Sequence, residues 1–415
     1  MVAAVVAVAV ADGQAAVKGE ALGGWTVVDT RETTDPYTRG LMWGKAGREA
    51  YFAARTTFEA VTLETTGKTL GFFEAAAVEL YMDKIPAELL AEIKGIADGI
   101  GVTPEEIVGW NSYIEMTGSW WPTQAPHLNM HMRNSHCSAF VATGSATADG
   151  GVVIGHTTFL EFWSGQYFTW VYKLATTAAA GEIVMQTMPG YVASMSDWWL
   201  TGAGLAVVET TIANFYGYDP SGMPEWVRAR LAAESAVDIA SFVAALDNGN
   251  NGGYASMWLV ADIKTGEIAR FEQGLKYTSL ATLTDGVFTG ANVAEDPRIR
   301  NLECFDSGYS DVRANTGARR VVWSMLVDEH YGNITTAQYL SDPTAVWAVP
   351  FFPAGSTDAK VANATDIAAL AFHARTGRAN GFAFDAAAYY ADHPQWAWLA
   401  PHLLDRPSQP MVYIA

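Results

Sequence analysis

The chain has 415 residues, of which 50% are hydrophobic and 17% charged, so it is expected to bury a substantial core. Its 25 basic and 44 acidic residues give a formal charge of −19. That balance argues against a nucleic-acid partner or an anionic membrane surface, because both need a cationic face on the protein.

The N-terminal segment, residues 1–16, is apolar and rich in small residues but far too short to cross a bilayer. Two interpretations stay open: the remnant of a secretory signal without its basic first region, or a frayed tail or edge strand. The first predicts a secreted or periplasmic protein, and the second a cytoplasmic one. No other segment approaches the roughly 18 uninterrupted apolar residues of a spanning helix, so no transmembrane segment is expected.

Residues from about 38 to 117 are predicted to be helical. Apolar positions recur along 44–80 with a break around Thr66, and again on one stripe of 86–98 that Gly99 to Gly101 ends. Thr103-Pro-Glu-Glu106 forms a capping box with proline at the first helical position, and starts a helix running to about Met116. Residues 123–136 show no periodicity and are predicted to form an exposed connector.

From Cys137 onward the pattern changes to short runs rich in β-branched and aromatic residues. Strands are predicted at 138–143, 152–158, 167–174, 182–187, 203–211, 257–262 and 267–272, with the second group continuing to about 290. Helices are predicted at 224–233, 237–246, 317–330 and 366–374, and the chain from 384 to its end is aromatic-rich and irregular. Two groups of strands with helices between and after them favour an α+β fold of stacked sheets flanked by helices over alternating βαβ units.

The first two of these strands are predicted to form a β-hairpin around the turn Thr147-Ala-Asp-Gly-Gly151. Cys137 lies eleven residues before Ala148 and His156 eight residues after it, so both fall toward the open end of the hairpin. A thiol on the first residue of a strand, near a histidine, suggests a nucleophile held by a sheet. The alternative for a single cysteine is a small buried hydrophobe.

Other kinds of site have no support in the sequence. No CxxC, HExxH, GxxxxGK[ST] or strand-linked GxGxxG motif occurs, so no metal, P-loop or dinucleotide site is predicted. The two cysteines cannot form a disulfide framework, and pairing Cys137 with Cys304 would require these distant positions to be adjacent.

The hairpin residues Ser135-His-Cys-Ser-Ala-Phe140, followed by Gly155-His-Thr-Thr158, resemble the autoproteolytic acyltransferase/hydrolase family of peptidase type C45. That family is acyl-CoA:6-aminopenicillanic acid acyltransferase-like, and the segments also resemble the related phospholipase B-like proteins. Further matches follow in the same order, so that the resemblance covers roughly residues 38 to 412. They include Gly252-Gly-Tyr-Ala-Ser-Met257, Asp296-Pro-Arg-Ile-Arg300, Gly317-Ala-Arg-Arg320 and Asp405-Arg-Pro-Ser-Gln-Pro410. Both families are N-terminal nucleophile hydrolases, which implies a four-layer αββα sandwich.

The resemblance implies that the chain cleaves itself between His136 and Cys137. Residues 1–136 would then be a helical leader that stays bound as the smaller chain, and residues 137–415 the catalytic αββα domain. Cys137 would carry both a thiol and a free α-amine, whose unperturbed pKa of about 8 suits it as general base toward its own thiol. No metal or organic cofactor is implied.

Three further residues receive roles from the same resemblance. His156 would orient Cys137 or assist proton transfer. Asn292, in Thr289-Gly-Ala-Asn-Val293, would donate its side-chain amide to the oxyanion, a contact worth about 3 kcal/mol. The histidine that often follows this asparagine in the C45 family is absent here. Arg319 resembles an arginine near the nucleophile, and the sequence does not separate it from Arg320.

Five residues are predicted to bind substrate. Thr210 and Thr211 stand at the end of a predicted strand, where the families place residues that line the site. Ser256 occupies a segment in which related sequences often carry asparagine or aspartate. Trp163 and Trp198 fall near the hairpin and would suit an apolar acyl or aromatic group, with simple core packing as the alternative for each.

These patterns predict an autoprocessed cysteine amidohydrolase or acyltransferase. It would cleave or transfer an acyl group from a small-molecule amide or ester through a thioester on Cys137. A phospholipase B-like lipid deacylase is the nearest alternative and would need a wider apolar cleft. An inactive scaffold or binding protein with the same fold is the alternative from another class, and would show an uncleaved chain or an unreactive Cys137. The sequence does not determine the acyl group, the leaving group or the oligomeric state.

Overall fold

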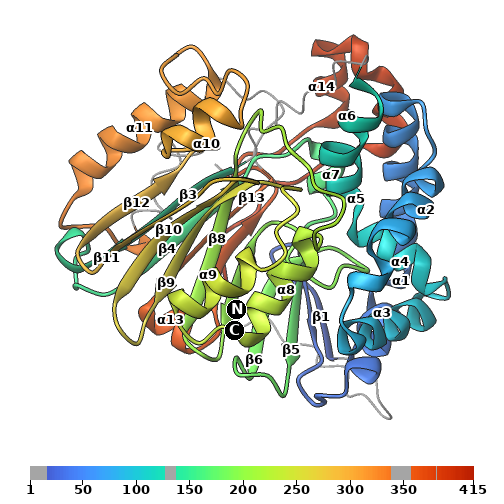
Figure 1. The fold of residues 1–415 in the computed structure, drawn as a ribbon, viewed down its shortest axis with the longest axis horizontal. Coiled ribbons are helices and arrows are strands. Elements are labelled where there is room, and N and C mark those ends of the chain that lie inside the picture. The colour runs from blue at the N-terminus through green and yellow to red at the C-terminus, as the bar shows by residue number, and fades with distance from the viewer. Residues whose placement is uncertain (1–15, 127–136, 338–356, 380) are drawn as a thin grey trace.

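The computed structural model describes residues 16–126, 137–337, 357–379 and 381–415. Its framework consists of two β-sheets, of nine and six strands, packed face to face. Helices cover the outer face of each sheet, so the layers run helices, nine-stranded sheet, six-stranded sheet, helices (Figure 1). The predicted α+β class and αββα sandwich are therefore confirmed.

The nine-stranded sheet begins with two strands that the sequence did not predict, β1 (Ala16–Leu22) and β2 (Trp25–Asp29). β2 pairs in parallel with β5 (Trp170–Ala175), and the other neighbours in this sheet pair antiparallel. The remaining strands, in spatial order, are β6 (Glu182–Thr187), β7 (Trp198–Thr201), β8 (Leu205–Thr211), β9 (Ser256–Asp262), β10 (Glu267–Gln273) and β11 (Thr278–Leu283). Residues before position 137 thus supply one edge of this sheet.

The six-stranded sheet is antiparallel throughout. Its spatial order is β12 (Gly286–Gly290), β3 (Cys137–Thr143), β4 (Val153–Thr158), β13 (Asp358–Asn363), β14 (Phe372–Thr376) and β15 (Val412–Ile414). The predicted helix at 366–374 is wrong beyond Ala368, where α13 (Ala364–Ala368) ends. Leu370 has a left-handed backbone (φ 51°), and Phe372 and Ala374 alternate into the core between the sheets. Burial on a strand overrides the helix propensity of this alanine-rich run.

The outer face of the nine-stranded sheet is covered by helices from both parts of the chain. They are α1 (Pro36–Thr66), α3 (Ala87–Ile100), α4 (Pro104–Asn111), α8 (Glu225–Ser235) and α9 (Ile239–Asp247), with α2 (Leu70–Tyr81) packed against α4. After α4 the chain continues through α5 (Tyr113–Glu115), a π-helical turn η2 (Met116–Trp120) and α6 (Trp121–Gln124). The predicted helices here are confirmed, including the cap at Thr103, whose side chain accepts from the backbone N–H of Glu106 at 3.2 Å.

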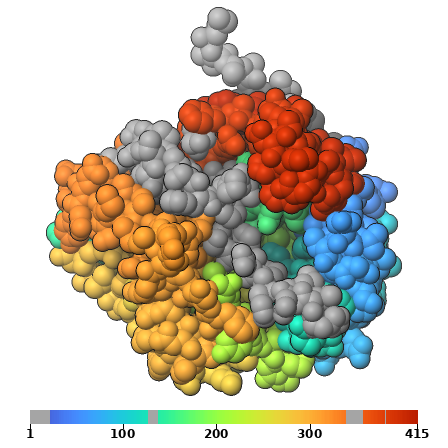
Figure 2. Space-filling model, turned by 90° about the horizontal axis from the view of Figure 1, so that it is seen from above, coloured from blue at the N-terminus to red at the C-terminus, as the bar shows by residue number. Residues whose placement is uncertain are grey.

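The other outer layer is smaller. Helix α11 (Asn315–His330) covers the outer face of the six-stranded sheet, where Trp323 packs against Phe140, and α10 (Pro297–Leu302) precedes it. The C-terminal residues, predicted to be irregular, contain α14 (Ala386–Asp392) and a 3₁₀ segment (Pro394–His402). They dock on α7 (Phe162–Gly165) through stacking of Phe384 on Phe162, and lie beside the N-terminal helices on one face of the molecule (Figure 2).

Helices α1 and α3 pack with their backbones in contact, because glycines occupy the crossing. Gly40 and Gly44 on α1 and Gly95 and Gly99 on α3 are spaced four residues apart, on one side of each helix. A Cβ atom on Gly95 would lie 2.1 Å from the carbonyl oxygen of Tyr37, and one on Gly40 would lie 2.2 Å from that of Glu92. The contact therefore admits no side chain on either helix.

Replacement of Gly95 by alanine is expected to lower the free energy of unfolding by at least about 1–3 kcal/mol, because the helices must separate to admit the methyl group. Urea unfolding followed by tryptophan fluorescence measures this change in the free energy of unfolding. Gly71→Ala on the exposed face of α2 is the matched control, since its Cβ would meet nothing closer than 3.9 Å. Equal midpoints for the two variants would contradict the packing argument.

Candidate active site

The predicted hairpin is confirmed, with β3 and β4 paired so that Cys137 lies opposite Thr158 and Ala139 opposite His156. Directly opposed residues, and residues two apart on one strand, share a face of the sheet. Ala139 lies in the core between the two sheets. Cys137 and His156 therefore both face the nine-stranded sheet, at the open end of the hairpin.

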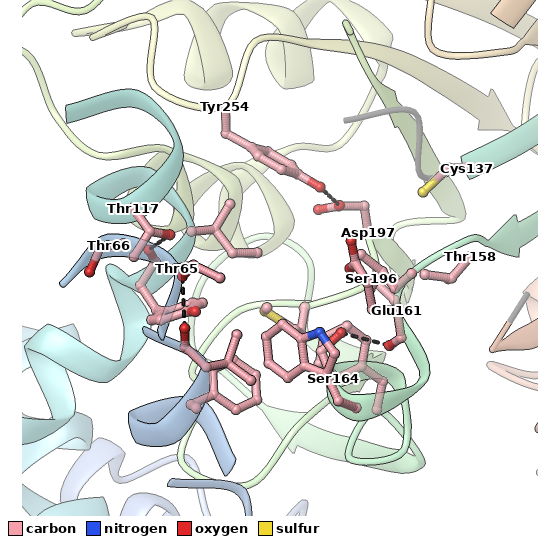
Figure 3. A pocket seen from close by; sticks show the side chains of 18 residues that line it. Thr65, Thr66, Thr117, Cys137, Thr158, Glu161, Ser164, Ser196, Asp197 and Tyr254 are labelled. Carbon is pink, nitrogen blue, oxygen red and sulfur yellow. Dashed lines mark hydrogen bonds between the residues drawn. The ribbon is translucent and has the colours of Figure 1, made fainter. Parts of the chain in front are cut away.

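Cys137 is buried and lies at the wall of a cavity of about 310 Å³ (Figure 3). The apolar part of the wall is built by both parts of the chain: Phe58, Val61 and Ile114 from before position 137, and Leu160, Phe168 and Met195 from after it. Three threonines, Thr65, Thr66 and Thr117, lie across the cavity from Cys137 in Figure 3. The described lining contains the acids Glu161 and Asp197 but no Lys, Arg or His side chain.

Asn292 fixes the backbone nitrogen of Cys137. Its Oδ1 accepts hydrogen bonds from Cys137 N at 2.9 Å and from Nη2 of Arg319 at 2.7 Å. Its Nδ2 donates to the carbonyl oxygen of Thr211 at 2.7 Å. Two donors directed at one atom identify that atom as the amide oxygen. One N–H of Nδ2 is thus engaged, and the second is the one left for the predicted contact with an oxyanion.

Helix α11 presents Arg319, rather than Arg320, to Cys137. Arg319 is buried and donates through Nη1 to the carbonyl oxygen of Cys137 and, at 3.1 Å, to Oγ of Ser138. Arg320 donates to the carbonyl oxygen of Tyr309 at 3.2 Å and lies over that ring. Consecutive helical residues point about 100° apart, so only one of the two can face the hairpin.

His156 is buried beneath the hairpin, outside the cavity wall. Its Nε2 lies 3.0 Å from the carbonyl oxygen of Glu209, which accepts but cannot donate, so Nε2 carries the proton. Its Nδ1 has no partner among the described residues and keeps a free lone pair. Burial, reinforced by Lys360, lowers the pKa of His156 well below its usual value, so the ring is neutral at neutral pH.

The environment of Cys137 opposes ionisation of its thiol. Burial raises the pKa of Cys137 well above its usual value, and the nearby carboxyl groups of Glu209 and Asp197 raise it further, whereas Lys360 acts in the opposite direction. Lys360, on β13, is buried and bonds Oδ1 of Asp358 at 2.9 Å and Oγ1 of Thr158 at 3.0 Å. The thiol therefore needs a base to become a nucleophile.

Sequence reasoning missed Lys360, Asp197, Glu209 and Tyr254 as parts of this site. The hydroxyl of Tyr254 lies 3.1 Å from Oδ2 of Asp197 and 3.0 Å from Oε1 of Glu209. Asp197, Tyr254 and Asn292 have positive φ angles of 52°, 56° and 61°, a conformation that non-glycine residues seldom adopt and that concentrates at functional sites. The sequence carries no signal of this strain.

Of the five residues predicted to bind substrate, Trp163 lines the described cavity and the other four do not. Trp198 packs in the core between the sheets. Thr211 contributes its carbonyl oxygen to Asn292, and Oγ of Ser256 donates to the carbonyl oxygen of Tyr254 at 3.1 Å. Thr210 is buried and packs against Gly290. Their roles stay predictions. His136 and the rest of the predicted connector from 127 lie outside the described residues.

In the described part of the chain, no group of three or more His, Cys, Asp or Glu side chains is placed to hold a metal ion. In the same residues, no helix combines the length and apolar character needed to cross a membrane.

Residues 105–289, less than half of the chain, match the family model for phospholipase B. The chain is 28% identical over 137 residues to phospholipase B-like protein G of Dictyostelium discoideum, covering 31% of this chain and 23% of that protein. It is 23% identical over 221 residues to phospholipase B-like protein C of the same organism, covering 47% of this chain and 39% of that protein. Identity to the putative phospholipase B-like 2 of Bos taurus is 27% over 154 residues, covering 33% of this chain and 25% of that protein. The resemblance to phospholipase B-like proteins is confirmed, although the matches span less than half of these relatives.

Solved structures of two proteins are similar over part of the chain. A variant of the conjugated bile acid hydrolase from Clostridium perfringens matches with a TM-score of 0.37 and 10% identity, covering 58% of this chain and 89% of that one. Penicillin V acylase from Agrobacterium tumefaciens matches with a TM-score of 0.37 and 13% identity, covering 58% and 83%.

Proposed function

We propose that this chain is a cysteine N-terminal nucleophile hydrolase that cleaves amides or esters of apolar acyl groups. The observation that carries the proposal is the position of Cys137. Its sulfur lies at the wall of an apolar cavity, while its backbone nitrogen is held by Oδ1 of Asn292 at 2.9 Å. Cleavage of the bond between His136 and Cys137 would turn that nitrogen into an α-amine beside the thiol.

The α-amine would supply the base that the buried thiol needs. Its unperturbed pKa is about 8, so a fraction is unprotonated at neutral pH. Asn292 Oδ1 would accept one of its N–H groups and fix its orientation. The thiolate would attack the substrate carbonyl carbon, and the second N–H of Asn292 Nδ2 would stabilise the oxyanion, a contact worth about 3 kcal/mol. Arg319 would hold the carbonyl oxygen of Cys137, and therefore the start of β3, in place.

The cavity supports an acyl group that is apolar and compact. Its volume of about 310 Å³ lies at the lower end of the range for small-molecule sites, roughly 300–1,000 Å³. Phe58, Trp163 and Phe168 line it, and aromatic walls of this kind bind apolar groups. The match of residues 105–289 to the phospholipase B family model supports hydrolysis of an acyl bond.

Residues 1–136 would stay bound as the smaller chain after cleavage. β1 and β2 belong to the nine-stranded sheet, α1 and α3 fill its helical layer, and α1 forms one wall of the cavity. Loss of this part would expose the core and open the cavity.

A phospholipase B-like lipid deacylase is the second candidate, favoured by the match of residues 105–289 to the phospholipase B family model. A phospholipid brings a phosphodiester that cationic side chains recognise best. The described lining holds no Lys, Arg or His, and it carries Glu161 and Asp197 instead. This charge pattern favours a neutral or cationic substrate over a phospholipid.

Acyl-enzyme trapping tests the proposal. The purified protein is mixed with p-nitrophenyl esters and p-nitroanilides of acyl groups of increasing length, quenched in acid and weighed by mass spectrometry. We expect the acyl mass on the fragment that begins at Cys137, and turnover that is fastest for compact apolar acyl groups. A Cys304→Ala variant, which removes the only other cysteine, should label equally. Absence of both adduct and product would leave the scaffold interpretation in place, and a preference for phospholipid vesicles would favour the deacylase.

A further inference from the structure

Two buried carboxyl groups lie in contact beside the cavity. Asp197, in the turn before β7, is 3% exposed, and Glu209, on β8, is fully buried. The hydroxyl of Tyr254 lies within 3.1 Å of Oδ2 of Asp197 and 3.0 Å of Oε1 of Glu209. Asp197 lines the cavity together with Cys137, and Figure 3 shows its side chain between Tyr254 and Cys137.

The geometry of this pair requires a shared proton. A tyrosine hydroxyl has a single proton and can serve only one of the two carboxyl groups at a time. Oε2 of Glu209 has no donor among the described residues. Two carboxylates in contact and removed from water cannot both ionise, so a proton held between Asp197 and Glu209 completes the arrangement. Burial, reinforced by the neighbouring Glu209, raises the pKa of Asp197 well above its usual value. Burial also raises the pKa of Glu209 to about 7, although its contacts with Asp197 and Tyr254 act in the opposite direction, so the proton resides mainly on Asp197.

The cavity side of the pair is open to a ligand. Ser196, next to Asp197, is 2% exposed, lines the cavity and has an Oγ without a partner in the described part of the chain. Asp197 and Tyr254 both have left-handed backbones, and their side chains meet at the hydrogen bond from the Tyr254 hydroxyl to Asp197 (Figure 3). A bound molecule would thus meet an acid group on the same wall as the thiol.

We propose that Asp197 is the general acid of the reaction, holding the proton that it shares with Glu209 and delivering it to the leaving group of the substrate. The proposal rests on the hydrolase function proposed above. Glu209 and Tyr254 are positioning residues that keep the proton on the pair.

In the reaction with an amide, the α-amine takes the thiol proton as Sγ bonds to the carbonyl carbon. When the C–N bond breaks, its electron pair stays on nitrogen, which takes the proton of Asp197, and the acyl group remains as a thioester. Water then attacks the thioester and returns a proton to Asp197. As the C–S bond breaks, its electron pair returns to Sγ, which takes the proton back from the α-ammonium. The sum is amide plus water giving acid plus amine.

Other titratable groups surround the pair on every side. From the six-stranded sheet these are Cys137 on β3, His156 on β4, and Asp358 and Lys360 on β13. From the helical side they are Glu115, Tyr191 and Glu225, around a small internal cavity that Asp197 also lines. Lys360 opposes the rise in the pKa of Asp197, and Glu225 adds to the rise at Glu209.

A comparison of leaving groups separates an acid from a structural residue. We expect Asp197→Asn to lower kcat/KM for an alkyl amide by about 10²–10⁴-fold, because alkylamines leave only when protonated. The p-nitrophenyl ester of the same acyl group should lose less than about tenfold, because p-nitrophenolate leaves without a proton. Asp149→Asn, on the exposed hairpin turn, is the matched charge control and should behave as the wild type with both substrates.

Equal losses with both substrates would overturn the proposal, and so would unchanged amide hydrolysis. Absence of an acyl adduct in the wild type would instead refute the hydrolase function itself.

Glu209→Gln gives a second measurement that does not depend on Asp197→Asn folding. Asp197 acts while protonated, so amide hydrolysis falls as pH rises through its pKa. Loss of the Glu209 charge makes Asp197 easier to ionise, and this alkaline limb should move to lower pH by at least one unit, or about tenfold in proton concentration. An unmoved limb would contradict the shared proton.

Discussion

A Cys137→Ala variant is expected to remain a single uncleaved chain and to lose essentially all hydrolysis, by a factor on the order of 10⁶ in kcat as for removal of other catalytic nucleophiles. Loss of self-cleavage and loss of hydrolysis both follow from removal of the Cys137 sulfur. In the proposed self-cleavage, Sγ attacks the carbonyl carbon of His136, the peptide nitrogen leaves as the α-amine of Cys137, and water hydrolyses the resulting thioester. Alanine removes the attacking atom of both this step and the substrate reaction.

Intact mass and N-terminal sequencing of the two proteins measure the effect. The wild type should give two fragments, one of which begins Cys-Ser-Ala-Phe, and the variant only the full chain. Cys304→Ala is the control: this second cysteine is also buried, but packs with Ile212 and Ala294 in a separate cluster, so cleavage should be retained. An uncleaved wild type would remove the α-amine base from the mechanism. Cleavage in the Cys137→Ala variant would show that another group attacks.

Replacement of Glu92 by alanine is expected to cost about 3–5 kcal/mol of unfolding free energy, because it leaves two buried guanidinium groups facing one shared carboxylate, Glu234, which lies 3.5 Å from Arg39 and 2.9 Å from Arg230. Glu92, on α3, is fully buried and accepts at Oε2 from Nε of Arg39 and from Nη2 of Arg230, each at 2.7 Å. Its Oε1 accepts from the hydroxyl of Tyr172 at 3.1 Å. These contacts join α1, α3, α8 and β5, and so tie residues before position 137 to those after it.

The pH dependence of this contribution follows from the pKa of Glu92. Burial alone would raise that pKa, but the guanidinium groups of Arg230 and Arg39 outweigh burial and lower it. A carboxyl group with a lowered folded-state pKa adds stability above its unfolded value, about 4.3, and the contribution is lost as pH falls through the folded-state pKa. The difference between wild type and Glu92→Ala should therefore be complete at neutral pH and shrink below about pH 4.

Urea unfolding in the Cys137→Ala background is the appropriate measurement, since an uncleaved chain unfolds independently of protein concentration. Glu88→Ala, on the exposed face of the same helix, is the matched control and should cost at most about 1 kcal/mol through its place near the helix N-terminus. A Glu92→Ala variant as stable as this control would contradict the assignment of the Arg39–Glu92–Arg230 cluster as the main link.

Much of the architecture could be read from the order of residue types along the chain. Helices α1 to α4 were predicted because apolar residues recur at helical spacing and Thr103 and Gly101 give recognisable ends. The hairpin was predicted because an Asp-Gly-Gly turn separates two β-rich runs, and a turn centred near Ala148 places Cys137 and His156 toward its open end. The register that pairs His156 with Ala139 is a finding of the structure. These signals are local, so no tertiary contact is needed to interpret them.

The elements that were missed or wrong have weak local signals. Strands β2 and β13 have five and six residues, and their pairing with distant segments, β2 with β5 and β13 with β4, decides that they are strands. Strand β7 has four residues and is stabilised by pairing with β6 and β8. Residues 366–374 contain several alanines and were predicted as a helix, yet burial of Phe372 between the sheets makes 372–376 a strand.

By itself, the sequence determined the α+β class, the hairpin and the place of Cys137 at its open end, because turn residues and hydrophobic periodicity act over a few positions. Only the tertiary structure decided that Arg319 rather than Arg320 reaches Cys137, since the two differ only in their direction around α11. It also decided that α1 forms one wall of the cavity and that Asp197 lies beside the thiol. The positions of Arg319, of the cavity wall from α1 and of Asp197 relative to Cys137 depend on how distant elements pack. Each brings together residues 60 or more positions apart, for which no local sequence pattern exists.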